Sequence, residues 1–105
     1  MKVSKEHLED RIEFFIKHKF YYLEYPDGVT EGFWKDGDGN NIYMPDMEMD
    51  HLKACIRLIE KDMDAYDNSK AKDSAHQPVR EALFPLAEKK LKELKEEFKR
   101  KANEI

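Results

Sequence analysis

A chain of 105 residues, of which 40% are apolar and 40% charged, is long enough for one domain with a modest core. That balance is typical of a helical protein with a strongly solvated surface, and it argues against a β-sandwich, a β-barrel and, given the 11% aromatic content, a disordered chain. The formal net charge is −4 and residues 24–67 alone carry a net −8, so we do not expect duplex nucleic acid as a partner.

Residues 4–19 are predicted to form the first helix. Ser4 is a favourable N-cap, since its hydroxyl can accept a bond from a first-turn N–H group. Apolar residues then recur on one helical face: Leu8, Ile12, Phe15 and Ile16. Acidic residues near the start and basic residues near the end complement the helix dipole. The helix is therefore expected to pack on a core through one side.

Three short segments that follow are predicted to form a small antiparallel β-meander. Residues 20–25 are aromatic and β-prone, and a Pro-Asp-Gly turn ends them. A second strand is expected within 29–34 and a third within 40–44, joined by the turn Asp36–Gly39. Such a sheet is too small to stand alone, so helices must cover one of its faces.

The turn also matches the start of a calcium-binding EF-hand loop. Asp36, Asp38 and Asn40 occupy the first three ligand positions. However, Asn41 replaces the glycine at the sixth position, and Met47 replaces the glutamate that closes the calcium shell at the twelfth. We therefore expect a plain hairpin turn, no metal site and no cofactor.

A central amphipathic helix is predicted up to residue 67, capped by Asp46 or the residues just after it, since Pro45 ends the preceding strand. Its apolar face consists of Met49, Leu52, Cys55, Ile56, Ile59, Met63 and Tyr66. The only cysteine lies on that face, which favours a buried, inert thiol. A single cysteine, no apolar run of about 20 residues and no apolar signal segment together indicate a cytoplasmic protein without a membrane partner.

Residues 1–67 thus form a helix–meander–helix core, residues 68–77 a polar linker, and residues 78–105 a long C-terminal helix of the same single domain. Pro85 is expected to kink this helix or divide it near residues 83–84. Its apolar stripe consists of Phe84, Leu91, Leu94, Phe98 and Ile105. A helix of this length looks too long for its own domain to cover, so we expect the stripe to form a dimer or a higher homo-oligomer. The fold class is α+β and mainly α.

One stretch has a specific spacing, W-x3-D-G-x2-I-x4-M-x3-H-L-x3-I-R. Its members are Trp34, Asp38, Gly39, Ile42, Met47, His51, Leu52, Ile56 and Arg57. In this spacing the chain resembles a group of small uncharacterised bacteriophage and prophage proteins, over about a quarter of its length and without a gap. The resemblance implies a phage accessory protein in the cytoplasm of a bacterial host, with no established activity.

Two functions are compatible with these residues. The first is a non-enzymatic protein that binds an anionic nucleotide signal in a pocket between protomers, as a phage counter-defence would require. Aromatic residues for stacking and cations for phosphate are candidates for that site: Trp34, Tyr43, His51, Lys53 and Arg57. The alternative is a protein–protein inhibitor or adaptor that acts on a host protein through the acidic 46–67 surface or the C-terminal helix. No enzyme is expected, because no convergent acid–base or metal-ligand set is present.

Overall fold

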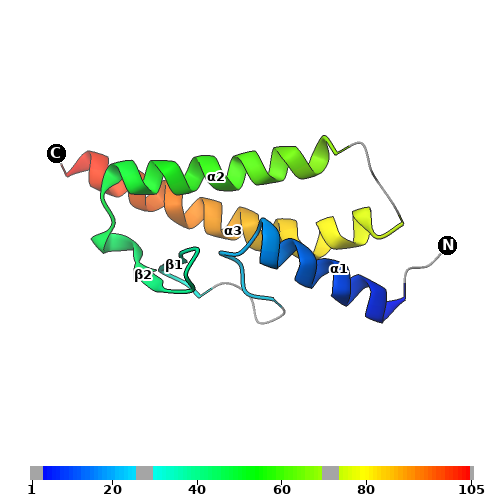
Figure 1. Ribbon diagram of the computed structural model, residues 1–105. Coiled ribbons are helices and arrows are strands. Elements are labelled where there is room, and N and C mark those ends of the chain that lie inside the picture. Colours follow the sequence, from blue (N-terminus) through cyan, green and yellow to red (C-terminus); the bar gives the residue numbers. More distant parts are fainter. Residues whose placement is uncertain (1–3, 26–29, 70–73, 105) are drawn as a thin grey trace.

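Helix α3 (His76–Asn103) is the longest element, and the rest of the chain packs along it (Figure 1). The computed structural model describes residues 4–25, 30–69 and 74–104. The other elements are α1 (Lys5–His18), β1 (Phe33–Lys35), β2 (Asn41–Tyr43), the 3-10 helix η1 (Met44–Asp46) and α2 (Met49–Asp67). Helices α1 and α2 and the short η1 all contact α3. The predicted class, α+β and mainly α, is confirmed.

Helix α1 forms as its sequence predicts. The Ser4 hydroxyl oxygen accepts a hydrogen bond from the His7 N–H group at 3.1 Å, which caps the first turn. Ile12 is buried, and the other apolar residues of its face lie half-buried against the core. At the C-terminal end, the Lys19 and Phe20 N–H groups both donate to the Phe15 carbonyl, which ends the helix.

The predicted strand at 20–25 is wrong. These residues form turns, and the Leu23 N–H group donates to the Phe20 carbonyl at 3.0 Å within the segment. Tyr22 and Leu23 are neighbours and yet both are buried, at 1% exposure each. An extended strand points successive side chains to opposite faces, so a turn is needed to bury both. The sheet therefore has two strands, and the predicted turn at 26–28 lies outside the described residues.

Strands β1 and β2 form the antiparallel hairpin that the turn predicted. Trp34 pairs with Ile42 at the centre of the register. The Asp36 carboxylate accepts bonds from the N–H groups of Asp38 at 3.0 Å and Asn40 at 2.8 Å. Gly39 has φ +85°, a conformation that glycine adopts without strain. The Asp36 carboxylate thus stabilises the turn itself, as a plain hairpin requires.

Helix α2 is capped two residues after Asp46, among the residues predicted as alternatives. Asp46 lies within η1, and Glu48 is the N-cap, without a side-chain hydrogen bond to the helix. The apolar face is buried at Leu52, Cys55, Ile59 and Tyr66. Asp62 lies on that same face and is also buried.

Helix α3 begins at His76, inside the predicted linker, and continues past Pro85 without division. Pro85 and Glu81, whose carbonyl loses its hydrogen bond, are both exposed. Water can therefore solvate that carbonyl, so the proline does not force the helix to end. In the described parts of the chain, no helix combines the length and the apolarity needed to span a bilayer.

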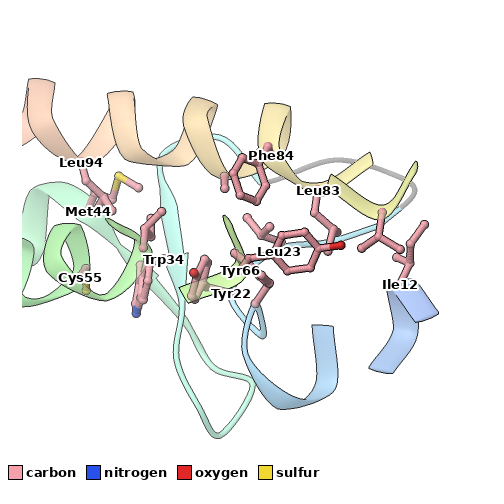
Figure 2. Close-up of a cluster of buried hydrophobic side chains, with 14 of the residues drawn as sticks. Ile12, Tyr22, Leu23, Trp34, Met44, Cys55, Tyr66, Leu83, Phe84 and Leu94 are labelled. Carbon is pink, nitrogen blue, oxygen red and sulfur yellow. The ribbon is translucent and has the colours of Figure 1, made fainter. Parts of the chain in front are cut away.

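The stripe expected to join protomers lies partly within the core of one chain. Phe84 and Leu94 are 3% and 0% exposed, and Figure 2 shows both among the core side chains. The reason is that α2 lies along α3 and covers it, which the sequence pattern of α3 alone does not indicate. Leu91 and Phe98 are half-buried against this core, and Ile105 lies outside the described residues. Phe84 and Leu94 are therefore core residues and not interface residues.

Two lysines of α3 attach the hairpin and η1 to this helix. Lys90 has 0% exposure, and its ammonium group donates to the carbonyls of Thr30 at 2.8 Å and Phe33 at 2.7 Å. Its nitrogen also lies 3.2 Å from the Glu93 carboxylate, which accepts the Gly32 N–H group at 2.7 Å. Burial lowers the pKa of Lys90, and the Glu93 carboxylate opposes that shift. Further along α3, Lys101 donates to the carbonyl of Pro45 in η1 at 2.6 Å.

Candidate functional site

The three cations predicted to bind a ligand lie on the outer surface of α2. His51, Lys53 and Arg57 are all exposed. None of the four hollows described in this section is lined by any of them. An exposed helix surface offers a small ligand contacts on one side only, whereas ligand sites are normally concave.

The two aromatic candidates are also separated by the fold. Trp34 is 2% exposed and stacks on Tyr22, with ring centroids 4.9 Å apart and planes 19° apart. Figure 2 shows both side chains within the core. A ring buried in the core offers little surface to a ligand, which argues against its predicted role in the site. Tyr43 is 49% exposed, but it borders a hollow of about 360 Å³ whose charged lining is one arginine, Arg100, and four glutamates: Glu31, Glu93, Glu96 and Glu97. This acidic surrounding disfavours an anionic ligand.

The largest hollow is a groove of about 840 Å³ between α1 and residues 23–25. Its floor is apolar, and its charged lining consists of three lysines and three glutamates: Lys5, Lys17, Lys35, Glu9, Glu13 and Glu24. Equal numbers of opposite charges give no preference for an anion or a cation. A further hollow, of about 360 Å³ on the surface of α3, likewise mixes lysines and glutamates.

The fourth hollow differs from the others in charge. We call it the basic pocket, and it is lined by Arg11, Phe15, Lys19, Ala65, Tyr66, Ser69 and His76. Its volume is about 120 Å³. None of its described lining residues carries a carboxylate, whereas each of the other three hollows has at least two. The chemistry of the basic pocket therefore favours an anion.

Three helices position the groups of the basic pocket. Arg11, Phe15 and Lys19 follow one another at four-residue steps, so they extend along one side of α1. The Tyr66 ring contacts the Phe15 ring edge-on, with centroids 5.0 Å apart, and stacks on the His76 ring, with centroids 4.3 Å apart and planes 14° apart. The Tyr66 hydroxyl donates to the His76 carbonyl at 2.7 Å, which joins the end of α2 to the start of α3.

The electrostatics of the pocket follow from these groups. The Arg11 guanidinium is partly buried and lies 5.4 Å from the centroid of the Phe15 ring. Helix α3 begins at His76, and its N-terminal end carries a partial positive charge. Its N-cap is Ala75, whose methyl side chain has no oxygen to accept first-turn N–H groups. The C-terminal end of α1 carries the opposite partial charge, which the Lys19 ammonium offsets.

A buried carboxyl lies near the pocket without lining it. Asp62 is 9% exposed, and its carboxylate accepts the Tyr22 hydroxyl at 2.9 Å. Burial raises the pKa of Asp62, while the Tyr22 hydrogen bond and the Lys19 charge partly oppose that rise. Burial, and then the Asp62 charge, also raises the pKa of Tyr22, so this phenol stays protonated and donates. Lys19 therefore acts on Asp62 as well as on the pocket.

Asp62→Asn is expected to make the protein's stability less dependent on pH. Because its pKa is raised in the folded state, the carboxyl contributes most to stability below its unfolded-state pKa of about 3.9. This contribution is lost as the pH rises through the folded-state pKa. Asparagine keeps an oxygen for the Tyr22 hydroxyl and carries no charge. Urea denaturation at pH 4, 5.5 and 7 should show that the free energy of unfolding of the variant rises relative to that of the wild type as the pH rises. The exposed Asp64→Asn is the control, and equal pH profiles for both variants would contradict the prediction.

The thiol on α2 is buried, as its position on the apolar face predicted. Cys55 is 4% exposed, and burial raises its pKa to about 12. A thiol that remains protonated at neutral pH is a poor nucleophile. Among the described residues, no group of three or more histidine, cysteine, aspartate or glutamate side chains is placed to hold a metal ion.

Sequence reasoning missed the basic pocket because its residues come from three separate segments. Arg11 and Lys19 lie within the predicted first helix, where neither was a candidate for a site, and His76 lies within the predicted linker. One local signal was present: the four-residue spacing of Arg11, Phe15 and Lys19 places two cations beside the apolar face. Only the packing of α1 against the junction of α2 and α3 turns that spacing into a pocket.

The basic pocket is therefore the site on which a function can be based. It unites cations, a hydroxyl and aromatic rings from three helices, with no carboxylate among its described lining residues. Comparison of the chain with protein-family models, curated proteins and solved structures found no match.

Proposed function

We propose that the chain is a non-enzymatic binding protein that captures a small phosphate-class oxyanion in the basic pocket. The observation that carries this proposal is the concave site lined by Arg11, Lys19 and His76, without a carboxylate among its described lining residues. Charge-assisted hydrogen bonds to oxyanions are stronger than neutral ones, and a site without carboxylates does not repel an anion.

Each group of the pocket has a distinct part in binding. The planar Arg11 guanidinium can donate two parallel hydrogen bonds to one phosphate, and its contact with Phe15 orients it. Lys19 supplies a compact positive charge, and the Ser69 hydroxyl can donate a further hydrogen bond. The N-terminal end of α3 adds its dipole, a common feature of phosphate sites.

The size of the pocket limits what it encloses. Its volume of about 120 Å³ is several times the roughly 30 Å³ that one water molecule occupies in the liquid. It is well below the roughly 300 Å³ at which pockets begin to enclose drug-sized ligands. The pocket thus suits a phosphate or sulfate group, and the remainder of a larger ligand would lie outside it.

The pocket is better suited to binding a ligand than to catalysing its conversion. A serine nucleophile needs a hydrogen bond to a base, and no Ser69–His76 hydrogen bond forms within the described parts of the chain. The His76 ring is instead stacked on Tyr66. If the chain is a phage accessory protein, as the resemblance predicts, capture would withdraw an anionic signal from the host cytoplasm and so serve counter-defence.

Arg11→Ala and Lys19→Ala are each expected to weaken binding of inorganic phosphate about tenfold, since a hydrogen bond to a charged group contributes about 1.5–3 kcal/mol. Isothermal titration calorimetry at low ionic strength measures this, because salt screens such contacts. Arg57→Ala and Lys17→Ala are the matched controls, since both cations are exposed and lie outside the pocket. Loss of binding in Arg57→Ala but not in Arg11→Ala would place the site on α2, as the sequence alone predicted.

A protein–protein adaptor is the second candidate. The outer surface of α2 is exposed and carries both signs of charge, with Asp50 and Asp64 among the cations Lys53 and Arg57. Such a surface can select a partner of complementary charge. Arg57→Glu reverses one charge on this surface. It should then abolish recovery of a host protein in affinity purification, while phosphate binding stays unchanged.

A further inference from the structure

One large aromatic side chain lies exposed beside the basic pocket. Phe14 is 51% exposed, which is more than the other two large exposed hydrophobic side chains of the described residues, Tyr43 and Tyr25. Its ring contacts the His18 ring, with centroids 4.5 Å apart, and the Phe15 ring edge-on at 5.6 Å. These contacts hold the Phe14 ring in place on the surface of α1, although half of it faces solvent.

Arg11 connects this ring to the pocket. Its guanidinium carbon lies 5.9 Å from the Phe14 centroid and 5.4 Å from the Phe15 centroid. Phe15 lines the pocket and Phe14 does not, so Arg11 lies where the pocket wall meets the exposed ring. A ligand whose phosphate contacts Arg11 would therefore have its next group within reach of Phe14.

We infer that the ligand of the basic pocket is a nucleotide, with its phosphate in the pocket and its base stacked on Phe14. This inference rests on the proposed function, since it assigns the part of the ligand that the pocket is too small to enclose. Base stacking on an aromatic side chain strengthens binding and tolerates any base, because every base has a π-face. The imidazole of His18, in contact with Phe14, extends the aromatic surface available to the base.

The test compares two probes that differ by the base alone, AMP and ribose 5-phosphate, by calorimetry on the full chain. We expect AMP to bind the wild type about tenfold more tightly than ribose 5-phosphate. In Phe14→Ala this ratio should fall to within about twofold, while the affinity for ribose 5-phosphate stays unchanged. Phe14→Trp, which keeps a stacking surface, should retain the tenfold ratio.

Tyr43→Ala is the matched control, because Tyr43 is a similarly exposed aromatic residue at the acidic hollow. It should leave the ratio of the two affinities unchanged. If inorganic phosphate and ribose 5-phosphate bind but AMP binds no more tightly, the nucleotide inference is overturned and the phosphate pocket stands. If none of the three binds, the proposed function fails, and the inference fails with it. If Tyr43→Ala loses the tenfold preference for AMP over ribose 5-phosphate and Phe14→Ala keeps it, the base stacks on the hairpin and the inference is also overturned.

Discussion

Lys90→Ala is expected to lower the free energy of unfolding by about 3–5 kcal/mol, the cost of removing one partner of a buried ionic group. The substitution leaves the carbonyls of Thr30 and Phe33 without their donor and the Glu93 carboxylate without its counter-charge. Burial of these unpaired groups is the physical reason for the large effect. Urea denaturation followed by circular dichroism measures it.

Lys89→Ala is the matched control, since the neighbouring lysine is exposed on the same helix, and its effect should stay within about 0.5 kcal/mol. Lys90→Met replaces the ammonium group by an apolar end of similar length and also leaves the acceptors unpaired, so it should remain strongly destabilised. A Lys90→Ala protein as stable as the Lys89→Ala protein would show that Lys90 does not hold the hairpin on α3.

Trp34→Ala is expected to destabilise the fold by about 3–5 kcal/mol, as for large aromatic residues removed from a core. The side chain is 2% exposed and stacks on Tyr22, whose hydroxyl donates to Asp62, so the cavity would lie between the hairpin and α2. The expected drop in melting temperature is more than 10 °C for a chain of this size. Differential scanning calorimetry measures it directly.

Two comparisons separate a core role from a ligand role. Trp34→Phe keeps an aromatic ring against Tyr22 and should recover part of the loss. Tyr43→Ala removes an exposed ring of the same hairpin and should have only a small effect on stability. If Trp34→Ala melts near the wild type and loses affinity for AMP, then Trp34 is a ligand residue, as its place in the sequence first indicated.

The hairpin is attached to α3, whereas the basic pocket lies where α1 meets the junction of α2 and α3. Lys90 and Glu93 hold the hairpin, Lys101 holds η1, and the stack of Tyr66 on His76 supports the pocket. Stability and binding can therefore be altered by separate substitutions, which makes the experiments above informative about one property at a time.

The sequence by itself determined the elements that depend on local interactions. The Ser4 cap, the apolar faces of α1 and α2, and the hairpin turn from Asp36 to Gly39 all formed where they were predicted. In each case the cause lies within a few residues: a hydroxyl near a free N–H group, apolar side chains one turn apart, or a glycine at positive φ. The three helices and their order follow from these short-range causes.

The segment at 20–25 shows the limit of local reasoning. Its aromatic residues favour a strand, yet the chain turns there because Phe20, Tyr22 and Leu23 are all drawn into the core. Burial of these side chains against the helices stabilises the fold more than a third strand at the edge of the small sheet would, since an edge strand pairs with only one neighbour. The β propensity was correct as a preference and was overridden by packing.

Only the tertiary structure decided which residues are core and which form a site. The sequence predicted that Trp34 binds a ligand and that Phe84 and Leu94 contact a second chain. In the structure all three side chains are buried within one chain. The sequence offered no reason for a buried Lys90, because the carbonyls that accept its hydrogen bonds are about 60 residues away. The basic pocket likewise exists only where three helices meet. Contacts between distant segments leave no periodic pattern in the chain, so the packing that creates them has to be seen in three dimensions.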